Sequence, residues 1–233
     1  MHTINTNDSS HSRTALVVRQ NSLVRQVYAW MGLGLTLTAV LAVATVSSPA
    51  LLQAIVGNRL VFYGLMIGEL ALVFILSGAV NRLSNTAATM LFLGYSALNG
   101  LTLSVIFLIY TADSIASTFL VTAAMFGAMS IYGYVTRRDL TSWGSFLFMG
   151  LIGIVIASVV NIFLKSPAVS WVVSGIGVLV FTGLTAHDTW KIKQLAAAGG
   201  EGRKPAILGA LTLYLDFINL FLMLLRFMGG RRD

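Results

Sequence analysis

Three acidic residues lie within long apolar runs of the chain, and they are the residues best suited to do chemistry. Glu69 lies in the second run, Asp188 ends the sixth and Asp216 lies in the middle of the seventh. A carboxylate inside a bilayer is costly unless it faces the protein interior and finds a partner there. Each of the three is therefore a candidate functional group. For Asp188, close to Lys191, the structural alternative is a residue that snorkels to the membrane surface.

Asp216 belongs to a polar stripe. Helical spacing places Gly209, Thr212, Asn219 and Met223 on its face of the seventh run. Two other runs have shorter polar edges, made by Thr182, Thr185 and Asp188 in the sixth and by Tyr95, Asn99 and Thr102 in the third. A polar stripe is hard to insert against lipid, so these edges predict a narrow polar core surrounded by apolar helices.

Asp188 and Asp216 are expected to form a pair. They flank a predicted basic loop from Lys191 to Pro205, and antiparallel helices joined by this loop would bring both carboxylates to the inner half of the membrane. Two nearby carboxylates in a medium of low dielectric constant do not both ionise readily, so the pair should share a proton and titrate as a unit. Oxygen ligands also suit calcium, which predicts a weak calcium site at Asp188 and Asp216.

A basic partner for the ionised pair is found at the inner end of the second run. Arg82 could form a salt bridge with the pair and act as a gate latch, and the alternative is an ordinary loop cation facing the cytoplasm. His187, directly before Asp188, adds a group that titrates near neutral pH. Glu69, Asn99, Thr185, His187 and Asn219 are the supporting polar residues of the predicted site.

The elements that position these residues are membrane-spanning helices. Of the 233 residues, 57% are hydrophobic and 10% are charged, whereas a soluble domain carries roughly 25% charged residues. The apolar runs are long enough to cross a bilayer. The seven predicted spans are Val27–Ser47, Leu60–Val80, Ala87–Tyr110, Ile115–Val135, Trp143–Leu164, Val169–His187 and Ala206–Phe227.

These spans predict an all-α membrane protein, a seven-transmembrane-helix bundle with short connections. Residues 1–25 are polar and predict a disordered cytoplasmic tail, residues 26–229 form the transmembrane domain, and residues 230–233 form a short basic tail. The excess of Lys and Arg in one set of loops predicts a cytoplasmic N-terminus. A full seventh crossing would export Arg226, Arg231 and Arg232, so a shallow or re-entrant last helix is the competing hypothesis.

Several classes of function have no support in the sequence. The sequence contains no basic stripe with interleaved aromatic residues, which is the pattern that would predict nucleic-acid binding. The chain has no Cys and no His-Glu-x-x-His or Gly-x-Ser-x-Gly segment, and Asp216 follows Leu213-Tyr214-Leu215 instead of the Gly-x-Gly of intramembrane aspartyl proteases. We therefore expect a protein that is not an enzyme and has no cofactor.

Three segments resemble the transmembrane Bax inhibitor motif family, including its bacterial inner-membrane members. They are Ser-Ala-Leu-Asn-Gly-Leu-Thr-Leu-Ser (96–104), Ala-His-Asp-Thr-Trp-Lys-Ile-Lys (186–193) and Leu-Tyr-Leu-Asp-Phe-Ile-Asn-Leu-Phe (213–221). The resemblance implies a central last helix wrapped by six others and a pH-sensitive calcium leak. It also implies that Asp188 and Asp216 form the pH sensor and that Arg82 is the latch. His187 stands where relatives commonly have Tyr.

The leading functional hypothesis is a pH-sensitive leak channel for calcium or a similar cation in the bacterial cytoplasmic (inner) membrane. A proton-coupled cation transporter would use the same acid pair. A third hypothesis is a non-transporting regulator of proteases or of the stress response, with other membrane proteins as partners. The expected partners are otherwise the lipid bilayer and calcium or protons.

Overall fold

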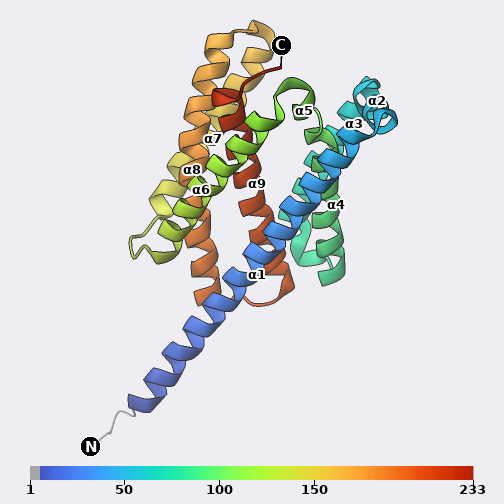
Figure 1. The fold of residues 1–233 in the computed structure, drawn as a ribbon. Helices are drawn as coiled ribbons and strands as arrows, with labels where there is room; N and C mark the ends of the chain where they lie inside the picture. Colours follow the sequence, from blue (N-terminus) through green and yellow to red (C-terminus); the bar gives the residue numbers. More distant parts are fainter. Residues whose placement is uncertain (1–5, 233) are drawn as a thin grey trace, which may run out of the picture.

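The computed structural model describes residues 6–232, with side chains from Asn21 onward except that of Asn81. Its elements are α1 (Thr6–Ser47), α2 (Pro49–Val56), α3 (Arg59–Ala79), the 3-10 helix η1 (Val80–Arg82), α4 (Asn85–Leu103), α5 (Ile106–Ile109), α6 (Ala112–Val135), α7 (Thr141–Leu164), α8 (Pro167–Ala197) and α9 (Arg203–Met228). The long helices form an elongated bundle (Figure 1).

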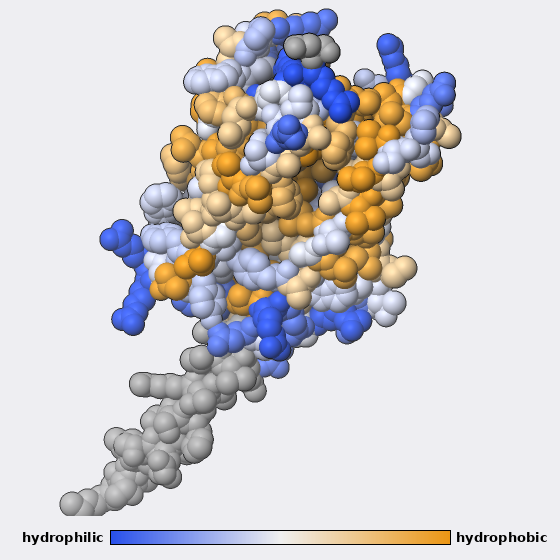
Figure 2. Space-filling model, viewed as in Figure 1, coloured by the Kyte–Doolittle hydropathy of each residue, from blue (hydrophilic) through white to orange (hydrophobic). Residues whose placement is uncertain are grey.

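The seven predicted spans are confirmed. The helices long and apolar enough to cross a membrane are α1 from Asn21 onward, α3, α4 together with α5, α6, α7, α8 and α9. Large apolar side chains point outward from the bundle, for example Leu60 at 84% and Phe163 at 81% exposure. The outer surface is mainly apolar between two polar ends (Figure 2). This distribution fits a protein whose solvent is lipid along most of its length.

Polar residues at the helix starts define several of these boundaries. The side chains of Ser48, Asn58, Ser84, Thr111 and Ser166 each accept a hydrogen bond from a backbone N–H in the first turn of the following helix. Such N-caps satisfy donors that have no partner within the helix. Before α7, the hydroxyl and backbone N–H of Thr141 donate to Asp139 Oδ1 at 2.6 and 2.8 Å. These bonds favour the ionised carboxylate and lower the pKa of Asp139.

Helix α8 continues well beyond the predicted span, so the prediction of a loop beginning at Lys191 is wrong. The helix ends at Ala197, and the connection to α9 is short. Buried residues Thr189, Ile192 and Ala196 keep the helical spacing past the first lysine. Lys193 Nζ donates to the backbone oxygen of Tyr134 at 2.7 Å, at the end of α6. A lysine that satisfies free carbonyls at the end of a neighbouring helix stabilises this extension of α8.

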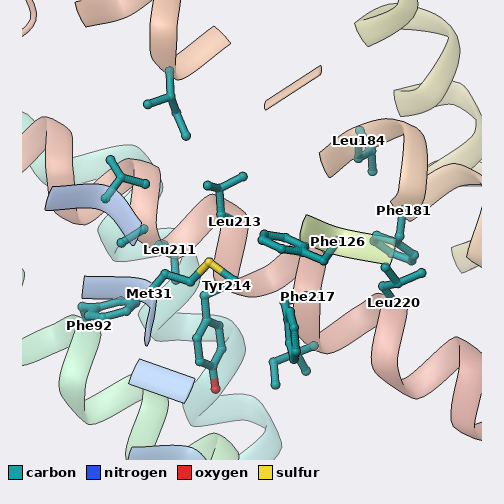
Figure 3. Packing of buried hydrophobic residues seen from close by; sticks show 14 of the residues in the cluster. Met31, Phe92, Phe126, Phe181, Leu184, Leu211, Leu213, Tyr214, Phe217 and Leu220 are labelled. Atoms are coloured by element: carbon teal, nitrogen blue, oxygen red, sulfur yellow. The ribbon is translucent and has the colours of Figure 1, made fainter. Parts of the chain in front are cut away.

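The last helix is the most buried span. In its most apolar window 61% of the residues are buried, against 6% in that of α3. It contacts α1, α4, α6 and α8. Its side chains Leu213, Tyr214 and Phe217 lie in the hydrophobic core between Met31 of α1, Phe92 of α4 and Phe126 of α6 (Figure 3).

Helix α9 crosses the whole bundle, so the chain ends at the side opposite the α8–α9 connection (Figure 1). Residues 230–232 lie against the start of α6. Thr111 N donates to Gly230 O at 3.2 Å, and Arg232 N donates to Ile109 O at 2.9 Å. The backbone of the predicted short tail is therefore paired with the α5–α6 connection. This arrangement contradicts the competing hypothesis of a shallow or re-entrant last helix.

At the other end, α1 is assigned from Thr6, within the segment predicted to be a tail. The predicted tail and domain boundaries stay predictions, as does the cytoplasmic side of the N-terminus. The first residues of the predicted tail lie outside the described part of the chain.

Candidate functional site

A cavity of about 740 Å³ lies between α7, α8 and α9. Its lining combines apolar side chains with a set of polar and charged ones, namely Thr141, Ser145, His187, Asp188, Lys191, Thr212, Asp216 and Asn219. The polar residues come from one face of each helix, at spacings of three or four residues. The structure therefore brings Asp188 and Asp216 to the same cavity, as predicted.

Asp216 is the most unusual group in this cavity. It is only 5% exposed, and its Oδ2 has no hydrogen-bond partner among the described residues. Asp188 lies within hydrogen-bonding reach of Asp216, on the neighbouring helix. Its own side chain is 14% exposed. A buried carboxylate oxygen without a donor is stable only if a proton, a cation or water satisfies it. The pair is therefore suited to holding a proton or a cation.

His187 contacts the other side of this pair. Its Nδ1 lies 2.8 Å from Asp188 Oδ1. Gly144 of α7 faces the same ring, and a Cβ atom built at Gly144 would lie 2.9 Å from His187 Cε1 and closer still to Nε2. The absence of a side chain at Gly144 thus makes room for the imidazole beside Asp188.

Replacing Gly144 by Ala should push the His187 ring away from Asp188. We expect a loss of about 1 to 3 kcal/mol of stability, the usual range for overpacking, measured as a lower unfolding temperature in detergent. Gly153→Ala is the matched control, because it lies on the same helix and a Cβ atom there meets nothing within 4 Å. Equal effects of the two substitutions would show that the His187 position does not depend on Gly144.

The polar stripe of α9 is largely confirmed. Thr212, Asp216 and Asn219 line the cavity together. Asn219 Nδ2 donates to Leu215 O at 2.8 Å, which leaves its side-chain oxygen available to the cavity. Gly209 has a different role, since a Cβ atom there would lie 2.9 Å from Val27 Cγ2. It allows α1 to approach α9 closely.

Beyond Asn219 the cavity is closed by apolar packing. A Cβ atom at Gly177 of α8 would lie 2.7 Å from Met223 Sδ of α9, so the methionine side chain rests directly on the glycine backbone. On the neighbouring helix α7, the side chain of Ile154 is also buried, with 5% of its surface exposed. These residues lie between the cavity lining and the opposite end of the three helices.

Glu69 belongs to a second polar group on α3 and α4. Thr102 Oγ1 donates to Glu69 Oε1 at 2.6 Å, and Asn99 Nδ2 lies 3.5 Å from Glu69 Oε2. The same amide nitrogen lies 3.5 Å from Tyr95 Oη. Asn99 Oδ1 is buried and has no partner among the described residues. Neither Glu69 nor Asn99 lines the cavity of the aspartate pair, so the predicted polar core consists of two separate groups.

Tyr214 of α9 lies next to this second group. Its ring packs edge-on against Tyr95, with centroids 5.6 Å apart. Its hydroxyl lies 2.6 Å from Thr38 Oγ1. Because Thr38 donates its own proton to a backbone oxygen, that of Ser96 at 2.8 Å or of Gly34 at 3.0 Å, Tyr214 is the donor. The contacts of Thr38 with Tyr214 and with Ser96 O together connect α1, α9 and α4.

Comparisons with known proteins agree with this architecture. A family model described as "Inhibitor of apoptosis-promoting Bax1" matches residues 20–233. The chain belongs to this Bax inhibitor family. It is 58% identical to the inner membrane protein YbhL of Escherichia coli strain K12 over 89% of this chain and 91% of that protein. It is also 42% identical to a membrane protein of Streptococcus pyogenes serotype M6, over 91% of this chain and 94% of that protein.

The predicted multi-pass inner-membrane localisation of this Bax inhibitor family protein is confirmed by its seven spans and by the E. coli relative. The predicted resemblance to the family is likewise confirmed.

Besides Glu69 and Asn99, two more predicted site residues lie away from the aspartate pair. Arg82 is exposed at the end of η1 and does not line the cavity. Its role as a latch stays a prediction. Thr185 is fully buried and donates to Phe181 O at 2.8 Å, within its own helix. Its hydroxyl is satisfied inside α8.

Lys191 and the α7 residues Gly144 and Ser145 also line the cavity, although they are not among the predicted site residues. The charged residues after His187 predict the end of the span and place Lys191 in a loop. The continuing helical spacing from Thr185 through Thr189 and Ile192 was the signal that could have kept it on α8.

Proposed function

We propose that this protein is a pH-sensitive leak for calcium or a similar cation across the inner membrane, with Asp188 and Asp216 as its sensor. The observation that carries the proposal is the buried Asp216, whose Oδ2 has no hydrogen-bond donor among the described residues while Asp188 lies within hydrogen-bonding reach. Membrane carboxylates placed in this way are typical of ion and proton pathways. We propose no catalytic reaction and no cofactor.

The direction of the pH dependence follows from the charge of the pair. When the pair holds a proton, it attracts a neighbouring cationic side chain weakly, and the path is free to open. When both carboxylates ionise, they attract such a cation strongly and close the path. Lys191 lines the same cavity and is one cation that can respond. Arg82 is the latch that the family resemblance implies. Leak should therefore be higher at acidic pH.

The proposed path also needs a moving barrier. Met223 rests on Gly177 beyond Asn219, and in this proposal it is the barrier between the cavity and the other membrane face. An unbranched, flexible methionine can change rotamer at low cost, which suits a residue at a constriction. Transport through the groove of α7, α8 and α9 would require Met223 to leave Gly177.

The same aspartate pair is also compatible with two other functions, a proton-coupled transporter and a regulator of other membrane proteins. A proton-coupled transporter would need the shared proton of the pair and would depend on a proton gradient. A regulator of other membrane proteins would need no flux at all.

The decisive experiment is calcium entry into liposomes containing the purified protein and a calcium-sensitive dye. We expect entry above that of protein-free liposomes, faster at about pH 6 than at about pH 8, because a pair that holds its proton attracts the closing cation more weakly than a fully ionised pair does. The rate should be unchanged when a protonophore removes the proton gradient. Loss of entry with the protonophore would favour the transporter, and no entry at either pH would favour the regulator.

A further inference from the structure

A second polar cavity lies at the opposite end of the same three helices. Its volume is about 340 Å³, and it is lined by Ser158, Asn161, Ile162, Ser170, Val173 and Arg226. The residues that line it lie on the far side of the Met223 constriction, toward the C-terminal end of α9. It is therefore separate from the cavity of the aspartate pair.

Arg226 supplies the positive charge of this cavity. It lies in the last turn of α9, and its side chain is exposed. Within the described part of the chain no carboxylate lies within ion-pair distance of it. A guanidinium group cannot lose its proton at physiological pH, so at the edge of a bilayer it requires an anion or water.

Neutral hydrogen-bond donors surround the guanidinium position. Asn161 Nδ2 donates to Ser170 Oγ at 2.7 Å, so the Ser170 hydroxyl keeps its own proton for another acceptor. Ser158 adds a second hydroxyl to the lining. Ser170 also lies in the first turns of α8, which begins at Pro167, and the positive end of a helix dipole favours an anion nearby. An arginine with hydroxyl and amide donors is the chemistry that recognises phosphate oxygens.

Apolar side chains lie beside these donors. Ile162 lines the cavity and is 68% exposed toward the lipid. Trp171 and Phe227, the residue after Arg226, pack together with ring centroids 4.8 Å apart. Aromatic rings of this kind sit at the level of lipid headgroups. A ligand in this cavity would thus have a polar group among the donors and an apolar part along the outside of α7 and α8.

We propose that this cavity is a binding site for a phosphate-bearing anion, which in the membrane is the phosphodiester headgroup of a phospholipid. Arg226 binds the phosphate oxygens, while Ser158 and Ser170 donate to them. The lipid chain extends along Ile162. The site is distinct from the aspartate pair, because its lining residues lie beyond Met223 on the same three helices.

The test is lipid binding to the full-length protein, purified in detergent and stripped of lipid, followed by native mass spectrometry. We expect phosphatidylglycerol and phosphatidylethanolamine to bind, and diacylglycerol, which lacks the phosphate, to bind much more weakly. Arg226→Gln should weaken phosphatidylglycerol binding about tenfold, as expected for the loss of a charge-assisted contact. Arg226→Lys should retain part of the affinity, since it keeps the charge but not the planar fork.

Arg59→Gln is the matched control. Arg59 is also exposed at a helix end and carries the same charge, but it does not line this cavity. Its replacement should leave binding unchanged. Inorganic phosphate that competes fully with phosphatidylglycerol would support a phosphate site without lipid specificity. Equal binding of phosphatidylglycerol by the wild type and Arg226→Gln, or equal losses for Arg226→Gln and Arg59→Gln, would overturn the proposal.

Discussion

Replacing Asp216 by Asn should remove most of the pH dependence of calcium entry into liposomes. The substitution keeps the size of the side chain but removes the group that shares a proton with Asp188. The ratio of entry rates at about pH 6 and about pH 8 should fall to about one, because the remaining carboxylate has no second carboxylate with which to share a proton. Asp188→Asn should have the same effect. The proton-sharing pair is the part of the proposed mechanism with the largest expected consequence.

The double variant tests whether the two aspartates act together. If they titrate as a unit, Asp188→Asn combined with Asp216→Asn should change the pH response little beyond either single change. His187 is the competing sensor, because its Nδ1 lies 2.8 Å from Asp188 Oδ1, so a proton gained or lost by the imidazole would act directly on the pair. His187→Tyr should leave the pH response largely intact. If His187→Tyr abolished the response while both Asn variants kept it, the aspartate sensor would be wrong.

Replacing Gly133 by Ala should be among the most destabilising single-methyl changes in the bundle. Gly133 of α6 lies against the backbone of α8, and a Cβ atom there would come 3.1 Å from Ala186 Cα and closer still to Ala186 O. A backbone carbonyl cannot rotate away as a side chain can, so the two helices must separate. We expect a loss of about 1 to 3 kcal/mol, or about 5 °C in the unfolding temperature measured in detergent.

Gly127 provides the control on the same helix. A Cβ atom at Gly127 meets nothing within 4 Å. Gly127→Ala should therefore be neutral or slightly stabilising, because alanine is the better helix former by up to about 1 kcal/mol. If the two variants unfolded at the same temperature, the close contact of α6 and α8 would not contribute to stability.

The membrane architecture could be predicted from the order of residues alone. Long apolar runs interrupted by charges, prolines and turn residues predict spans because a bilayer accepts little else, and the structure confirms all seven. The end of α8 is the exception. Lys191 and Lys193 predict a loop there, although Ile192 and Ala196 are buried and the helix continues past them. A charged residue ends a span in the bilayer but does not end a helix.

The sequence also predicted which residues share a helix face. Thr212, Asp216 and Asn219 line one cavity because helical spacing places them on one side of α9. The predicted meeting of Asp188 with Asp216 rests on a loop that joins two antiparallel helices. The connection is shorter in the structure than the predicted loop from Lys191 to Pro205. Helical spacing and the connection between consecutive helices are sufficient to predict both arrangements.

Only the tertiary structure decided which faces meet. It places Glu69 and Asn99 in a group between α3 and α4, away from the aspartate pair. It brings Gly144 of α7 against His187 and leaves Arg82 exposed at the end of η1. The spacing along one helix says nothing about the rotation of that helix relative to its neighbours. That rotation is set by close contacts such as Gly133 on Ala186 and Met223 on Gly177, which involve residues far apart in the chain.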